Sequence, residues 1–264
     1  MVIDKKQATT EELNRHKKQG KKFTVGGTMK RSALSRKLAR FIPLLILIFV
    51  SLLSHVLLTG FSTFKHEFFY PIQVYEKITI DVYGAVLPTL LSVSFIVLYF
   101  TYFKGSFPRI FGCFLFAFAL FANSFTLALT DHGFGLQTVP GTLALFISPV
   151  SIVIIFFDER ALKAKALLSS ISSGLARNYV VALLATFSAS SLSVLFVDLI
   201  FAPFLNQEPL LTTVDIGGGG LTDGVLFSGL FALVWTTFFV SVLALFIEIV
   251  RLSERKDHDY KESK

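Results

Sequence analysis

Three aspartates and a run of four glycines lie close together in the last third of the chain, and they are the residues best suited to form a polar site. Asp198 lies inside one apolar segment, and Asp223 opens the next one. A carboxylate within or at the edge of a membrane span is energetically expensive, so it usually faces other protein groups or a water-filled cavity. The candidate ligand-binding residues are Asp198, Asp215, Gly217, Gly218, Gly219, Gly220 and Asp223.

Asp198 shares a helix face with hydroxyl side chains. Ser191 and Ser188 precede it, and the three residues have spacings of three and seven, which place them on one side of a helix. This pattern favours a polar network within a helix bundle. The alternative is that Asp198 reaches the membrane surface, which lies only one or two helical turns away.

Structural roles compete with ligand binding at the other candidates. Asp223 is a favoured N-cap residue and suits the positive end of a helix dipole. The run Gly217–Gly220 is compatible with a tight turn, and also with a close approach of the backbone to a ligand. Asp215 precedes the glycines and is also typical of a solvated loop.

No recognised motif assigns a reaction to the chain, so we expect a protein that is not an enzyme, with no catalytic residue and no defined cofactor. The sequence contains no phosphate-binding loop, nucleophile elbow or zinc-protease motif. A metal site could be assembled from residues on three separate segments, but their spacing matches no known ligand pattern, so we predict none. These residues are His55, His66, Asp131 and His132.

The composition predicts a membrane protein, because 53% of the residues are hydrophobic and only 16% are charged. We expect a single all-α, polytopic membrane helical bundle with about six transmembrane helices. Pro149 can kink the fourth span, which is also the shortest. The six apolar segments are Phe41–Phe61, Val82–Phe103, Ile110–Thr130, Gly141–Phe157, Tyr179–Leu205 and Gly224–Val250.

Basic residues alternate between the predicted loops. Of the 25 Lys and Arg residues, only Lys65 and Lys77 fall in segments assigned to the outer side. The positive-inside rule therefore predicts that both termini are cytoplasmic and that the protein lies in the cell membrane. The net charge of +7 then reflects orientation and not a nucleic-acid partner.

The charge pattern also suggests three regions. Residues 1–40 form a basic cytoplasmic tail whose end is either an amphipathic helix at the lipid interface or simply the basic flank of the first span. Residues 41–250 form the membrane domain, and residues 251–264 form a charged cytoplasmic tail. The expected partners are the lipid bilayer and either other membrane subunits or further copies of this chain.

Two stretches resemble a prokaryotic multi-pass membrane family known as domain of unknown function 1614. Ile216-Gly-Gly-Gly-Gly-Leu-Thr-Asp-Gly-Val-Leu-Phe-Ser-Gly-Leu230 is similar to its motif IGGAGTFDGIFLTGI, and Val197-Asp198-Leu-Ile looks like the preceding Asp element. The resemblance covers about residues 186–235. It implies that the two aspartates matter together, but it names no reaction, because the family has no established activity.

Presenilin-like intramembrane aspartyl proteases also carry two aspartates on adjacent spans. Here Val197 stands where a Tyr is expected before Asp198, and Gly220-Leu-Thr-Asp223 replaces the expected Gly-x-Gly-Asp. Two functions therefore lead: binding and translocation of an ion or small solute at an outward-facing site, or an accessory role in a larger membrane complex. An intramembrane aspartyl protease is the third alternative.

Overall fold

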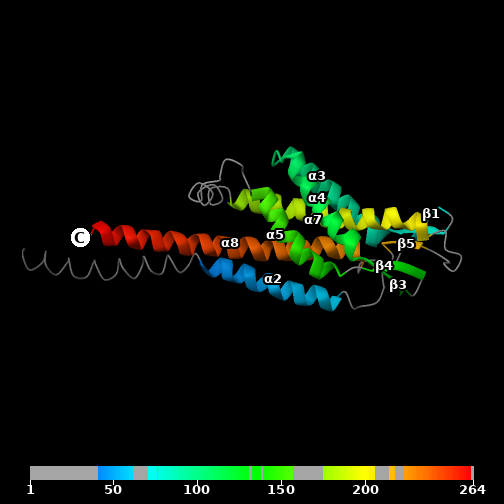
Figure 1. Ribbon diagram of the computed structural model, residues 1–264, viewed down its shortest axis with the longest axis horizontal. Coiled ribbons are helices and arrows are strands. Elements are labelled where there is room, and N and C mark those ends of the chain that lie inside the picture. The colour runs from blue at the N-terminus through cyan, green and yellow to red at the C-terminus, as the bar shows by residue number, and fades with distance from the viewer. Residues whose placement is uncertain are drawn as a thin grey trace, which may run out of the picture. The chain divides into compact units, whose positions relative to one another are not determined.

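The computed structural model describes residues 41–61, 71–75, 77–130, 133–137, 139–156, 175–205, 214–217 and 223–262. The chain divides into two compact units, residues 1–46 and 47–264. Apart from the beginning of α2, all described helices and strands belong to the second unit (Figure 1). The predicted amphipathic helix before residue 41 and the predicted cytoplasmic loop at 158–174 lie outside the described residues.

In chain order, the helices are α2 (Phe41–Phe61), the π-helix η1 (Val82–Val86), α3 (Leu87–Thr101), α4 (Phe107–Ser124), α5 (Pro140–Phe156), α7 (Leu175–Leu205) and α8 (Gly224–Glu262). The strands are β1 (Pro71–Tyr75), β2 (Ile78–Asp81), β3 (Thr126–Thr130), β4 (Gly133–Gln137) and β5 (Val214–Ile216). Each of the six apolar segments predicted from the sequence contains a helix.

Five of the described helical segments are long and apolar enough to cross a membrane. The sixth, α5, has 17 residues and contains Pro149 within one continuous helix. The predicted helical architecture is confirmed, and this set of apolar helices is compatible with a membrane bundle. The five longer segments are Phe41–Gly60, Val82–Thr101, Phe107–Ser124, Arg177–Phe204 and Gly224–Ser253.

One predicted boundary was wrong. The third apolar segment does not continue as a helix to Thr130, because α4 ends at Ser124 and Thr126–Thr130 forms β3, which pairs with β4. Hydropathy alone does not separate a short apolar strand from the end of a helix. At the other end of the chain, α8 continues past Val250 to Glu262, so most of the predicted C-terminal tail is helical.

The prediction of an all-α fold missed two small sheets. β2 pairs antiparallel with β1 and parallel with β5, and β3 and β4 form a hairpin. The run Ile78-Thr-Ile-Asp81 has three consecutive β-branched residues, which favour a strand. In β5, Val214 and Ile216 are buried and contact a small apolar cluster that includes Ala85 and Ala202.

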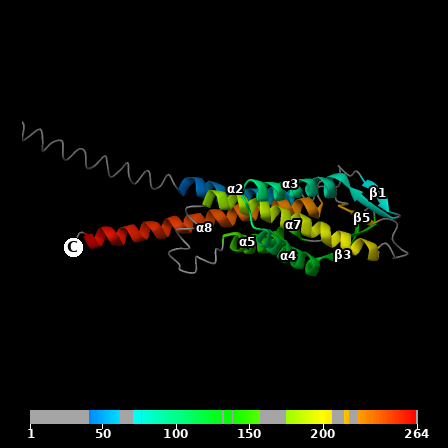
Figure 2. The ribbon, with the colours of Figure 1, turned by 90° about the horizontal axis from the view of Figure 1, so that it is seen from above.

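The strands gather where α7 ends and α8 begins (Figures 1 and 2). β4 lies against β5, and β5 contacts both β2 and α7. We call this end of the second unit the sheet end. It therefore brings together the candidate residues that follow α7 and precede α8, although they come from separate elements.

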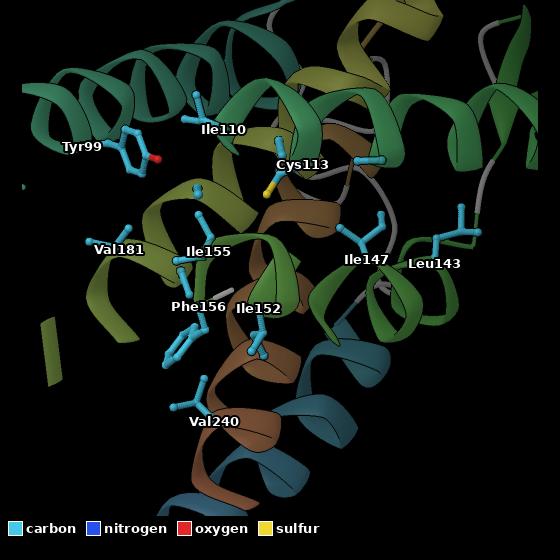
Figure 3. Packing of buried hydrophobic residues seen from close by; sticks show 14 of the residues in the cluster. Tyr99, Ile110, Cys113, Leu143, Ile147, Ile152, Ile155, Phe156, Val181 and Val240 are labelled. Atoms are coloured by element: carbon cyan, nitrogen blue, oxygen red, sulfur yellow. The ribbon is translucent and has the colours of Figure 1, made fainter. Parts of the chain in front are cut away.

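The core of the second unit surrounds α7, which packs against α3, α4, α5 and α8. Of the most apolar stretch of α7, 67% is buried inside the protein. Figure 3 shows part of the core, in which Cys113, Ile147 and Ile155 lie among side chains from neighbouring helices. The lone cysteine is therefore an interior packing residue, as expected for a buried free thiol.

Candidate functional site

Asp223 caps the N-terminus of α8, as one reading of the sequence predicted. Its Oδ1 accepts a hydrogen bond from the N–H of Val225 at 2.7 Å, and its carbonyl oxygen accepts one from the N–H of Phe227 at 3.0 Å. The first N–H groups of a helix have no partners within that helix, and the helix dipole favours a negative charge there. The cap therefore fixes a carboxylate at the sheet end.

The carboxyl group of Asp198 lies close enough to Asp223 for their charges to interact. Asp198 is partly buried and belongs to the part of α7 that approaches the sheet end. Two like charges held close together away from water repel each other, so a proton or another cation bound between them stabilises the pair. The structure thus brings together the two aspartates that the sequence analysis selected on adjacent apolar segments.

Gly217 is the member of the glycine run whose backbone is described, and its conformation requires glycine. Its φ of 74° lies in the left-handed region. A Cβ built on Gly217 would lie 2.7 Å from both the Cβ and the nitrogen of Ala85. Both glycine properties considered in the sequence analysis, positive φ and close backbone approach, therefore apply at this position.

The close partner of Gly217 is Gly84 in η1. A Cβ on Gly84 would overlap the carbonyl oxygen of Gly217 and would lie 2.9 Å from the Cβ of Asp223. Because neither glycine has a side chain, the backbone of η1 comes into contact both with Gly217, which follows β5, and with the start of α8. This contact places the helix cap of α8 directly beside the beginning of the second apolar segment.

Asp81 is a buried carboxylate that the sequence analysis did not select. Its exposed fraction is 0%, and its Oδ1 accepts a hydrogen bond from the N–H of Gly84 at 2.6 Å. It caps η1 much as Asp223 caps α8. The available signal was an aspartate immediately before the apolar run that begins at Val82, the same pattern that drew attention to Asp223.

Asp215 is not a loop residue, as one interpretation held, but lies in the middle of β5. The hydroxyl of Thr79 in β2 donates a hydrogen bond to its carboxylate. The β2–β5 register pairs these two residues directly. This bond ties the strand before the glycine run to the strand before η1.

The remaining candidates lie outside the described residues. They are Gly218, Gly219 and Gly220, together with Thr222. Three of the four residues considered for a metal site also fall there, namely His66, Asp131 and His132. The fourth, His55, packs against the rings of Phe231 and Trp235 with centroid distances of 5.2 and 5.1 Å.

Within the described part of the chain, no three His, Cys, Asp or Glu residues gather as a set of metal ligands. Among the acidic residues at the sheet end, Asp198 and Asp223 interact with each other, whereas Asp81 caps η1 and Asp215 accepts a hydrogen bond from Thr79. A pair of carboxyl groups can share a proton or neutralise a single cation. That is the chemistry available to this arrangement.

Comparison of the chain with protein-family models, with curated proteins and with solved structures gives no match. The resemblance of residues 186–235 to domain of unknown function 1614 therefore stays a prediction.

Proposed function

We propose that this protein binds a small cation at an acidic site and takes part in the translocation of an ion or small solute across a membrane. The supporting observation is the approach of Asp198 on α7 to Asp223 at the start of α8. Carboxylates that interact inside a helical membrane protein are costly unless they are neutralised, and they commonly mark ion or proton pathways. We call these two residues the acidic pair.

The irregular backbone around the acidic pair supports the same function. A π-helix, η1, opens the second apolar segment, and Gly217 has positive φ beside it. π-helical turns are frequent at functional sites, and transporters build their binding sites from interrupted helices whose ends point at the bound ion. The Gly84–Gly217 contact places irregular backbone of this kind next to Asp223 at the start of α8.

In the proposed orientation the sheet end faces the outside of the cell. The distribution of basic residues supports this orientation, because the segments that flank the sheet end carry only Lys65 and Lys77. Both termini are then cytoplasmic. The acidic pair is thus proposed as an outward-facing site, and the resemblance to domain of unknown function 1614 would make it a feature shared with that family.

A second candidate function is that of a subunit in a larger membrane assembly, or in a homo-oligomer. The observation that favours it is α2, where large apolar side chains remain exposed, with fractions of 65% for both Phe49 and Val56. Lipid can cover such a surface, but so can the helices of a partner. In this alternative the aspartates only hold helices together.

The third alternative, an intramembrane aspartyl protease, would use the same acidic pair as a catalytic dyad. The proximity of Asp198 and Asp223 is compatible with it. The departures at Val197 and at Thr222 from the protease pattern argue against it. We therefore place cation binding first.

The test is cation binding to the purified protein in detergent. A cation that binds only the folded protein raises the temperature of thermal unfolding increasingly as its concentration exceeds its Kd, so titration with sodium, potassium and calcium chloride reveals a site. We expect a shift with at least one of these cations or with protons, and its loss in Asp198→Asn and Asp223→Asn.

The matched control is Glu248→Gln, since Glu248 lies 3.8 Å from Arg251 near the other end of α8. This variant should respond to cations and protons as the wild type does. If the two aspartate variants also keep the full response, the acidic pair is not the binding site, and the subunit function becomes the better account.

A further inference from the structure

Polar groups continue from the acidic pair along the contact between α7 and α8. Because the two helices are antiparallel, residues that approach the sheet end on α7 face residues near the start of α8. Asp198 meets Asp223, Ser191 meets Gly229, and near the opposite end the hydroxyls of Tyr179 and Thr237 lie 3.0 Å apart. We call this line of contacts the α7–α8 seam.

The middle of the seam is closely packed. A Cβ on Gly229 would overlap the Oγ of Ser191 and would lie 2.6 Å from Cε2 of Phe187. Only glycine at this position lets α8 approach the serine hydroxyl so closely. A hydrated metal ion or an organic solute therefore has no room between Ser191 and Gly229 unless the helices separate.

Buried hydroxyls along the seam are the second observation. Ser191 and Thr236 each have an exposed fraction of 0%, and neither hydroxyl finds a hydrogen-bond partner among the described residues. Thr236 follows Gly229 by seven residues and so lies on the same face of α8. Serine and threonine in helices commonly bond to the carbonyl four residues earlier, as Thr186 does with Ala182.

The same polar region extends to α3. The hydroxyl of Ser188 donates a hydrogen bond to the carbonyl oxygen of Ser92 at 3.1 Å, one turn from Ser191. The hydroxyl of Ser92 is itself fully buried and has no partner among the described residues. Buried polar groups normally hydrogen-bond to protein or to water, so the hydroxyls of Ser191, Thr236 and Ser92 are the groups here that bound water would satisfy.

We propose that the α7–α8 seam is a proton path that connects the acidic pair with the opposite end of the bundle. A proton is the cation that suits such a seam, because it moves by exchange along hydrogen bonds and needs no space for a hydration shell. Each hydroxyl along the path accepts one proton and releases another. Seven helical residues span about 10 Å, so the proposed path requires bridging water between Ser191 and Thr236, and also between Asp198 and Ser191, which are likewise seven residues apart.

This inference deepens the proposed function and rests on it, since the acidic pair is the site that loads the proton. It specifies the proton as the cation and the seam as its route. Tyr179 and Thr237 form the last pair of hydroxyls before the opposite end. Proton binding at the acidic pair and proton movement along the seam are separate steps, so they can be tested separately.

The test is proton flux into liposomes that contain the purified protein and a trapped pH-sensitive dye, with a pH gradient and a potassium–valinomycin potential imposed. We expect faster acidification than in empty liposomes. Ser191→Ala and Thr236→Val should slow it several-fold while the unfolding temperature and its response to protons stay near those of the wild type. Asp198→Asn should lose both the flux and the response.

The control variants remove hydroxyls that lie outside the seam. The hydroxyls of Ser94 and Thr101 on α3 are exposed and bond to the carbonyls of Leu90 and Val97. Ser94→Ala and Thr101→Val should conduct protons as the wild type does. Wild-type flux equal to that of empty liposomes, or unchanged flux in Ser191→Ala and Thr236→Val, overturns the seam even if cation binding at the acidic pair persists.

A second measurement does not depend on transport. In a Cys113→Ala background, the S–H group of Ser191→Cys should exchange to S–D after transfer into D2O, as followed by infrared spectroscopy, because this exchange needs water alone and no bulkier reagent. The comparison is Phe196→Cys, at an α7 position that is 45% exposed on the apolar surface and should exchange more slowly in a bilayer. An S–H group of Ser191→Cys that does not exchange would contradict a hydrated seam.

Discussion

Gly84 lies against Gly217 so closely that a Cβ on Gly84 would overlap the carbonyl oxygen of Gly217. Gly84→Ala should therefore separate η1 from the start of α8 and lower the free energy of unfolding by about 1–3 kcal/mol, the usual range for overpacking. Thermal unfolding in detergent measures the change. Gly112→Ala is the control, because its new Cβ would meet Ile154 at an ordinary 3.8 Å. Equal stability of the two variants would show that the Gly84 contact is not tight.

Gly217→Ala tests the backbone conformation beside the same contact. Its φ of 74° costs a non-glycine residue about 1–2 kcal/mol, and the new Cβ would also meet Ala85 at 2.7 Å. We expect reduced stability together with weaker cation binding, since Gly217 helps to position Asp223. If Gly217→Ala binds and unfolds as the wild type does, this turn does not shape the site.

Asp81 should stabilise the start of η1 through its hydrogen bond to the N–H of Gly84. Asp81→Ala removes this cap and should lower the free energy of unfolding by about 0.5–2 kcal/mol, whereas Asp81→Asn keeps an oxygen acceptor and should lose less. Thermal unfolding of both variants decides the matter. An Asn variant as unstable as the Ala variant would mean that the charge of Asp81, and not its capping bond, is the stabilising feature.

The orientation of the bundle can be tested by thiol labelling in a Cys113→Ala background. Tyr75 in β1 is 60% exposed at the sheet end, and Ser253 near the end of α8 is also exposed. Tyr75→Cys in intact cells should react with a membrane-impermeant reagent added outside. Ser253→Cys should react only after the membrane is permeabilised. The reverse pattern would invert the proposed topology and place the acidic pair on the cytoplasmic side.

The helices and the Asp223 cap could be predicted from the sequence because both depend on local patterns. The apolar segments are long, and an aspartate at the start of such a segment is a local capping signal. Asp198 was found in the same way, as a charge within an apolar run. These features need no knowledge of which distant segments meet.

The sheets and the burial of Asp81 depend on contacts between distant segments, which a single sequence does not reveal. Thr79 and Asp215 lie 136 residues apart, yet they share a hydrogen bond between β2 and β5. β5 has only three residues, too few for a periodic signal. The capping position of Asp81 carried a local signal, as that of Asp223 did, but its complete burial could not be read from that signal.

The coupling between Asp198 and Asp223 is the most direct test of the proposed site, and a double-mutant cycle measures it. The unfolding temperature and its response to cations and protons are recorded for Asp198→Asn, Asp223→Asn and the double variant. If the carboxyl groups share one bound cation or proton, either single change abolishes the response and the second adds little. Independent effects that add up in the double variant would contradict a shared site.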